Sequence, residues 1–249
     1  PRTEGLFARI ERWWNTKQPD DVFWRSITKD NITTWYGKSN NSRIADPDDS
    51  THIFSWLICE SYDDKGNVIV YSYKGENADG VDQSQVHEHH RVRAANRYLK
   101  NVYYGNHVPY LPKLTDDAPW PEPDGDEKWF FEVVLDYGEH DPVCPTPQDA
   151  GIWTVRNDPF SSYRSSFEVR TYRLCQRVLM FHHFPEVEKV GQNCLVRSTD
   201  LLYSYEESPF DKRNPIYSKL ISITQVGYQR TDAHNYASKS MPPLHFTYS

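Results

Sequence analysis

The pattern of apolar and polar positions predicts a chain built mostly from β-strands. Residues 5–14 alternate between the two kinds, which is typical of an extended segment with one packed face. Residues 22–28 and 32–36 are β-branched and aromatic runs joined by a short polar connection, as in a hairpin. We expect these two runs to pair antiparallel.

A second hairpin is predicted further along, where residues 52–62 and 67–73 flank the turn Asp63-Asp64-Lys65-Gly66. Asp63 can cap the turn with its carboxylate, and Gly66 can adopt a positive φ. Further strands are expected at residues 97–104, 129–137, 167–184, 194–206, 219–230 and 244–249, separated by polar turns. This order indicates a mainly β fold of antiparallel strands and hairpins, with no helix required.

Three segments need separate interpretation. Residues 167–184 carry arginines at helical spacing, yet their Val, Thr, Tyr and Phe content favours a strand, which we expect. Residues 74–93 are polar and read as a surface loop, and residues 105–128 are rich in proline, which excludes a central strand. By contrast, residues 129–137 are almost continuously apolar and predict a central strand buried on both faces, with Phe130 and Phe131 pointing to opposite faces.

The composition supports a globular β protein and limits the classes of molecule that it is expected to bind. Among 249 residues there are 28 Lys and Arg against 35 Asp and Glu, a net charge of −7 that argues against nucleic acid. Aromatic residues make up 14% of the chain, and flat rings pack well on pleated strands. No stretch approaches the ~20 apolar residues of a membrane helix, so no membrane span is expected.

The chain starts at Pro1 without a methionine or a readable targeting signal, so we interpret residues 1–4 as the start of an excised fragment. The four cysteines are far apart and form no C-x-x-C pair, which is typical neither of a zinc site nor of a dense disulfide framework. We expect buried free thiols at Cys59, Cys144, Cys175 and Cys194.

Two histidine clusters are candidate metal ligands. His87-Glu88-His89-His90 contains residues that suit zinc or copper, but its fifth position is Arg91, so the H-E-x-x-H motif is absent. Because the segment is polar, we expect a loop without a bound metal. His182 and His183 are neighbours in a predicted strand and face opposite ways, so we expect one packed and one exposed histidine.

The chain offers no catalytic signature. Glu186 and Glu188 have the E-x-E spacing of ADP-ribosyltransferases, but the Ser-Thr element that should precede them occurs only afterwards, at Ser198 and Thr199. The G-x-S-x-G motif of hydrolases is absent. Paired acids such as Asp20-Asp21 and Asp116-Asp117 are typical of solvated turns. We therefore predict a non-enzymatic chain with no catalytic, cofactor-binding or metal-binding residues.

One hairpin carries information beyond its fold. The run YDDKGNVIVYSY, residues 62–73, resembles the tyrosine-aspartate (YD) repeat of Rhs proteins, in which hairpins build a β shell. The stretches GLFARIERW, WRSITKDNITTWYG, IFSWLICESYDDKGN, ANRYLKNVYYGN, FEVVLDYGEHD, DPFSSYRSSFEVRTYRLCQRVLMFHHFPE and KSMPPLHFTYS are similar to the SpvB-type domain of the B component of bacterial toxin complexes, the Tc toxins. These stretches lie between residues 5 and 249.

The resemblance implies a partial SpvB-type domain at residues 5–249 that lacks the glycine-rich part expected upstream. It implies a segment of an Rhs-like β shell that encloses a toxic C-terminal effector and is secreted. Its partners would be the remaining shell domains, the enclosed effector and, indirectly, the pore-forming A component. The chain itself has no long Rhs array, effector or recognisable propeller.

Two other classes of function stay open from the residues alone. Exposed Trp and Tyr side chains can stack on sugars, so a module that binds carbohydrate or a cell-surface protein is the main alternative. A hydrolase or transferase rests only on the His and Glu clusters described above.

Overall fold

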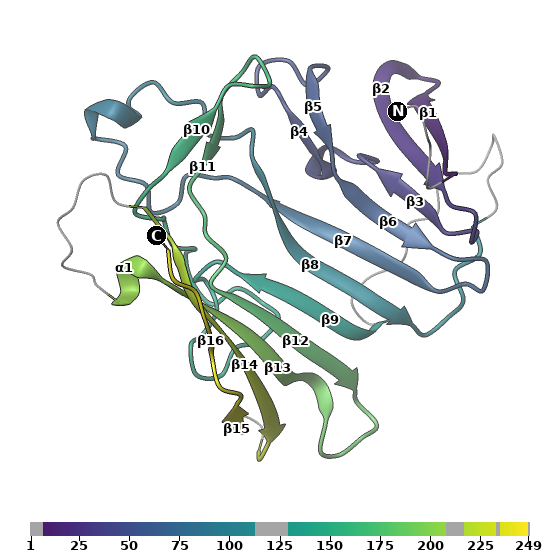
Figure 1. Ribbon diagram of the computed structural model, residues 1–249. Helices are drawn as coiled ribbons and strands as arrows, with labels where there is room; N and C mark the ends of the chain where they lie inside the picture. The colour runs from purple at the N-terminus through teal and green to yellow at the C-terminus, as the bar shows by residue number, and fades with distance from the viewer. Residues whose placement is uncertain (1–6, 113–128, 208–216, 233–234, 249) are drawn as a thin grey trace.

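The computed structural model describes residues 7–112, 129–207, 217–232 and 235–248. Antiparallel strands form one 12-stranded sheet and two small two-stranded sheets, which confirms the mainly β prediction (Figure 1). One short helix was not expected, α1 (Ser204–Glu207), and two 3-10 turns are present, η1 (Asn40–Ser42) and η2 (Val86–Glu88). None of the helices in these ranges is long and apolar enough to cross a membrane.

The large sheet follows the chain as a meander. From one edge to the other its strands are β1 (Arg9–Asn15), β2 (Gln18–Ile27), β3 (Thr33–Tyr36), β6 (Ile58–Tyr62), β7 (Val68–Gly75), β8 (Arg97–Asn106), β9 (Trp129–Asp136), β12 (Arg177–Phe184), β13 (Gly191–Tyr203), β14 (Leu220–Arg230) and β15 (Tyr236–Ser240), while β16 (Leu244–His245) also pairs with β14. The small sheets pair β4 (Arg43–Ala45) with β5 (Ile53–Trp56), and β10 (Phe160–Ser162) with β11 (Val169–Thr171). Within the described ranges the sheet is an open path that ends at β1 and at β15 (Figure 1).

Both predicted hairpins are confirmed. β2 pairs with β3, and β6 pairs with β7. In the second turn Asp63 Oδ1 accepts hydrogen bonds from the backbone N–H groups of Lys65 and Asn67, each at 2.9 Å. Gly66 has a φ of +90°, and a Cβ there would lie 2.7 Å from Pro109 Cβ. The turn therefore needs both its aspartate and its glycine.

The prediction of one strand at residues 52–62 is wrong, because two strands with different partners occupy the run. β5 pairs with β4, and β6 pairs with β3 in the main sheet. Between them the Leu57 N–H donates to the Ser42 carbonyl, and its own carbonyl accepts from the Gly37 N–H, each at 2.8 Å. These bonds come from residues distant in sequence, so the apolar pattern alone does not reveal the change of partner.

The prediction of one strand at residues 167–184 is also wrong. β11 ends at residue 171 and β12 begins at residue 177, and the chain between them belongs to neither strand. None of the three arginines at helical spacing lies in a helix, because Arg170 is in β11, Arg177 is in β12 and Arg173 lies between these strands, and each meets a separate acid. The pairs are Arg170 with Glu88 at 2.6 Å, Arg173 with Glu76 at 2.5 Å, and Arg177 with Asp136 at 2.7 Å.

Most of the segment 74–93 is a loop as predicted, but residues 74–75 end β7, residues 86–88 form η2, and part of the segment is buried rather than on the surface. Glu76 and Glu88 are both buried. The Glu76 carboxylate pairs with Arg173, and the Glu88 carboxylate pairs with Arg170. Arg173 also lies over the Trp153 ring, 4.2 Å from its centroid. Charge pairing thus holds the loop against β11 and the residues that follow it.

Strand β9 lies in the middle of the sheet, between β8 and β12, as predicted. It is not buried on both faces: Glu132, Val134 and Asp136 are buried, whereas the residues between them are half-buried. Nor do Phe130 and Phe131 separate to opposite faces as expected, because both rings lie against Phe184, at centroid distances of 5.1 and 5.9 Å.

Two apolar clusters form the core. One contains Val134, Leu179, Phe181 and Leu195, with Tyr228 and Tyr236 packed against it. The other contains Tyr98, Tyr137 and Trp153. Residues 5–6 of the first predicted strand, residues 113–128 of the proline-rich loop, Asp116-Asp117 and Ser249 lie outside the described residues.

Candidate functional site

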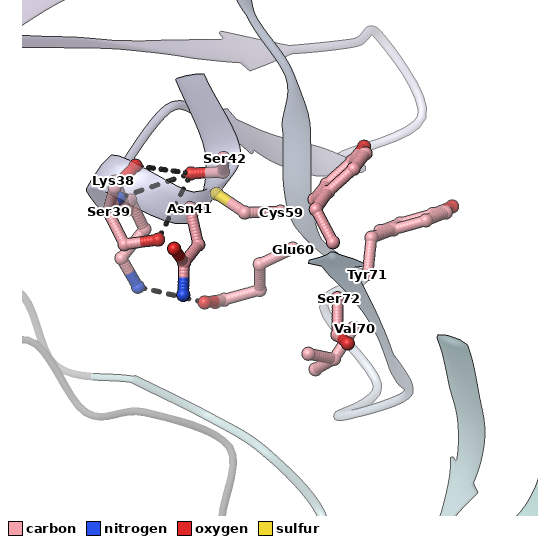
Figure 2. Close-up of a pocket in the computed structure, with 10 residues that line it drawn as sticks. Lys38, Ser39, Asn41, Ser42, Cys59, Glu60, Val70, Tyr71 and Ser72 are labelled. Carbon is pink, nitrogen blue, oxygen red and sulfur yellow. Dashed lines mark hydrogen bonds and ion pairs between the residues drawn. The ribbon is translucent and has the colours of Figure 1, made fainter. Parts of the chain in front are cut away.

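A polar cavity of about 260 Å³ lies between the turn η1 and the strands β6 and β7. Figure 2 shows its side chains, with those of η1 on one side and those of β6 and β7 on the other. Hydroxyl, amide and charged groups line it. The lining residues are Lys38, Ser39, Asn41, Ser42, Cys59, Glu60, Val70, Tyr71, Ser72 and Tyr73.

An ion pair forms the charged part of this cavity. Lys38 Nζ lies 2.9 Å from Glu60 Oε2, and the two side chains are 10% and 4% exposed (Figure 2). The other carboxylate oxygen, Glu60 Oε1, is buried and has no hydrogen-bond partner among the described residues. A buried acceptor without a donor costs free energy, about 1–3 kcal/mol. This oxygen is therefore poised to accept a further hydrogen bond.

Cys59 beside this pair is not a nucleophile. Burial raises the pKa of its thiol, which keeps the group protonated at neutral pH. Its Sγ lies 3.3 Å from the Trp35 carbonyl oxygen, to which the thiol donates. The cavity is suited to binding rather than to covalent chemistry.

A second polar cavity of about 550 Å³ adjoins the first and shares Lys38 and Ser39 with it. It also contains an ion pair, between Arg43 Nη2 and Asp21 Oδ1 at 2.6 Å. The remaining lining residues are Gln18, Asp20, Asn40, Ser50 and Thr51. Together the two cavities form a polar depression lined by two cations, Lys38 and Arg43, and by three carboxylates, Glu60, Asp20 and Asp21.

A different kind of cluster lies at the end of β9. Asp136, Glu139 and His140 are buried, and their ligand atoms lie within 4.8 Å of one another. Such a set suits a divalent cation. However, the ammonium of Lys100 already contacts it, with Nζ 2.5 Å from Glu139 Oε1 and 2.6 Å from His140 Nε2. Asp136 Oδ2 pairs with Arg177 at 2.7 Å. The ligand atoms thus already serve protein cations, and the set does not fit a metal.

The contacts of His140 define its protonation. Nδ1 lies 2.9 Å from the Thr146 carbonyl, which can only accept, so Nδ1 carries the proton. Nε2 then accepts from the Lys100 ammonium, and the imidazole is neutral. Burial, together with the charge of Lys100, lowers the pKa of His140 below its ordinary value. The cluster joins β8, β9 and the loop after β9.

The residues of the first histidine cluster, at positions 87–90, lie in different environments. His87 is exposed, and His89 Nε2 lies 3.0 Å from the Ser84 carbonyl. Glu88 between them is buried and bonds to Arg170 and Tyr172. Burial raises the pKa of Glu88, but the hydrogen bonds from Tyr172 and Arg170 lower it by more, so the residue stays ionised. Glu88 is a structural anchor in this arrangement.

His182 and His183 also differ in environment. His183 is buried, with Nε2 3.3 Å from Glu132 Oε2, which confirms the expected packed histidine. His182 is half-buried rather than exposed, and its ring lies 5.0 Å from that of Phe131.

The two glutamates of the E-x-E spacing lie on the surface. Glu186 and Glu188 are exposed in the turn after β12. Ser198 is buried inside β13, where it pairs with Leu179.

The four cysteines are free; Cys194 is buried, whereas Cys59, Cys144 and Cys175 are half-buried rather than buried as expected. Burial raises the pKa of Cys175 to about 12.

Sequence reasoning missed the Lys38–Glu60 pair and the cluster around Lys100. A signal was available for the strand residues, because Glu60 and Lys100 each interrupt an apolar strand run. A charge in such a position is buried only with a partner. The partners Lys38 and Glu139 come from other segments, so only the fold identifies them.

Comparison with known proteins places the chain in a family. The family described as Salmonella virulence plasmid 65kDa B protein, SpvB, matches residues 1–184. Mono(ADP-ribosyl)transferase SpvB of Salmonella typhimurium (strain 14028s / SGSC 2262) is 39% identical over 232 residues, which cover 92% of this chain and 37% of that protein. The same figures hold for the protein of Salmonella enteritidis. The chain thus spans little more than a third of these relatives.

Solved structures agree. The N-terminal domain of effector protein SpvB from Salmonella typhimurium strain LT2 is 38% identical with a TM-score of 0.78, covering 92% of this chain and 68% of that one. The crystal structure of TcdB2-TccC3 is 32% identical with a TM-score of 0.81, covering 99% of this chain and 11% of that one. Sequence and fold together therefore assign this chain to the SpvB family, and it matches a segment of Tc toxin components.

Proposed function

We propose that the chain is a non-enzymatic segment of a β shell that encloses a toxic C-terminal effector in a secreted bacterial toxin complex. The observation that carries this proposal is the open sheet, whose described path ends at β1 and β15. Ile10 and Trp14 on β1 are 66% and 54% exposed, as expected of an edge that a further strand covers. The similarity of nearly the whole chain to 11% of the TcdB2-TccC3 chain supports a wall segment of a larger assembly.

In this role the chain is a partial SpvB-type domain at residues 5–249. Its partners are the remaining shell domains at the two sheet edges and the effector inside, with the pore-forming component contacted indirectly. The buried charge pairs that hold loops 74–93 and 138–150 support a rigid wall, because breaking one leaves an unpaired charge inside.

The test uses the longer natural protein that carries this chain. We expect its C-terminal segment to resist a protease under conditions that cleave the same segment expressed alone. The double variant Ile10→Lys, Trp14→Lys places charges on the β1 edge and should restore cleavage, while Ile152→Lys, at an exposed loop position, should not. A C-terminal segment cleaved equally fast in both contexts contradicts the shell.

The absence of catalysis is tested separately. The relatives named mono(ADP-ribosyl)transferase are matched over 37% of their length, so their activity is not transferred to this chain. We expect no cleavage of NAD and no labelling of a target by the isolated chain. Activity that is lost in Glu186→Ala or Glu188→Ala, with unchanged melting temperature, contradicts this part of the proposal.

A further inference from the structure

The cavity beside η1 offers a hydrogen-bond donor next to an acceptor. The Lys38 ammonium has three N–H donors, and one of them points to Glu60 Oε2 at 2.9 Å. Glu60 Oε1 on the same carboxylate has no donor among the described residues. A ligand group that both donates and accepts satisfies the two sites at once.

The charges of the depression limit the ligand. Lys38 balances Glu60 in the cavity beside η1, and in the adjoining cavity Arg43 pairs with Asp21 while the exposed Asp20 adds one negative charge. A cationic ligand at Glu60 would face the Lys38 ammonium, and an anionic one would face the Glu60 carboxylate. A neutral ligand avoids both costs.

We propose that this cavity is a binding site for a neutral, hydroxyl-rich ligand of the carbohydrate class. Adjacent hydroxyls of a sugar ring each donate and accept, which matches Lys38 and Glu60 Oε1. The amide of Asn41, beside the Lys38–Glu60 pair, supplies further polar contacts (Figure 2). The adjoining cavity leaves room for a second sugar unit.

This site is independent of the proposed shell. It differs from the exposed aromatic residues considered in the sequence, because its central group is a buried carboxylate. Residues around η1 and from β6 and β7 form it, and β6 pairs with β7 from Glu60 opposite Val70 to Tyr62 opposite Val68, so paired strands fix the position of Glu60.

The test titrates the natural protein with D-glucose, D-galactose, D-mannose and N-acetyl-D-glucosamine, and with inorganic phosphate and arginine amide as charged probes. Binding is followed by saturation-transfer NMR and calorimetry. We expect at least one sugar to bind at millimolar concentration, and the charged probes not to bind. Glu60→Gln should weaken sugar binding about tenfold, since it removes the ionised acceptor.

Glu132→Gln is the matched control, because Glu132 is another buried carboxylate on the sheet, paired with His183 and outside the cavity. It should leave sugar affinity unchanged. If Glu60→Gln fails to fold, Asn41→Ala at the exposed rim should still weaken binding without altering the melting temperature. Failure of all four sugars, equal affinity in Glu60→Gln or Asn41→Ala, or only ordered water at Glu60 Oε1 in a crystal grown with sugar overturns the proposal.

Discussion

At the residue scale, Arg173–Glu76 is the ion pair most removed from solvent in the described part of the chain, with both side chains 0% exposed. Replacing Arg173 by Met leaves the Glu76 carboxylate buried without its partner. We expect a loss of about 3–5 kcal/mol in the free energy of unfolding, measured in urea. Arg9→Met, which removes an exposed ion pair with Glu11, should cost no more than about 1 kcal/mol.

The double variant Arg173→Met, Glu76→Gln tests the cause of that loss. Because the second change removes the unpaired charge, it should recover at least about 1 kcal/mol of the loss. A double variant less stable than Arg173→Met would show that packing around Trp153, and not the charge, dominates.

Because His140 is buried in its neutral form, we expect the free energy of unfolding to depend on pH. Its pKa is lowered by burial and by Lys100 from an ordinary value of 6.5, so the unfolded chain binds the proton more readily than the folded one. Stability contributed by the neutral imidazole is therefore present above pH 6.5 and is lost as the pH falls through and below that value. Urea midpoints measured from pH 7 downward should fall.

His140→Gln, whose amide oxygen can still accept from Lys100, should flatten part of that fall. His182→Gln is the comparison, since burial lowers the pKa of His182 as well, but this side chain is only half-buried. We expect a smaller flattening there. Identical pH profiles for the natural chain and His140→Gln would contradict the assigned neutral state.

At the element scale, three aromatic rings join the start of β9 to the end of β12. Phe130 and Phe131 are both half-buried and both pack on Phe184, so their replacement by Ala should have similar effects, about 2 kcal/mol each. Leu179→Ala at a fully buried position should cost more, about 3–5 kcal/mol. One severe and one negligible phenylalanine variant in urea melts would indicate that the rings face opposite sides after all.

At the scale of the whole molecule, the open sheet edges lead us to expect that copies of the chain associate with one another. β1 exposes Ile10 and Trp14 beside backbone groups available for pairing, so the chain expressed by itself should self-associate as its concentration rises. Ile10→Lys with Trp14→Lys should shift sedimentation towards the monomer, and Ile152→Lys should not. A chain that sediments as a monomer at all concentrations contradicts an adhesive β1 edge.

The sequence by itself determined the strands and turns whose causes are local. Apolar and aromatic runs joined by short polar connections predicted the β2–β3 and β6–β7 pairs, and Asp63 with Gly66 predicted the turn between β6 and β7, because strand propensity and turn chemistry act over a few residues. The apolar run of β9 also predicted its central place.

Only the tertiary structure decided where strands change partner and which charges meet inside. The breaks near Leu57 and Arg173 depend on bonds to Ser42 and Glu76, which the local pattern does not contain. The same holds for Lys38 with Glu60, since a charge inside an apolar run signals that a partner exists but not which segment brings it. Strand pairing across the sheet brings distant residues together, and this creates both the buried pairs and the polar cavity.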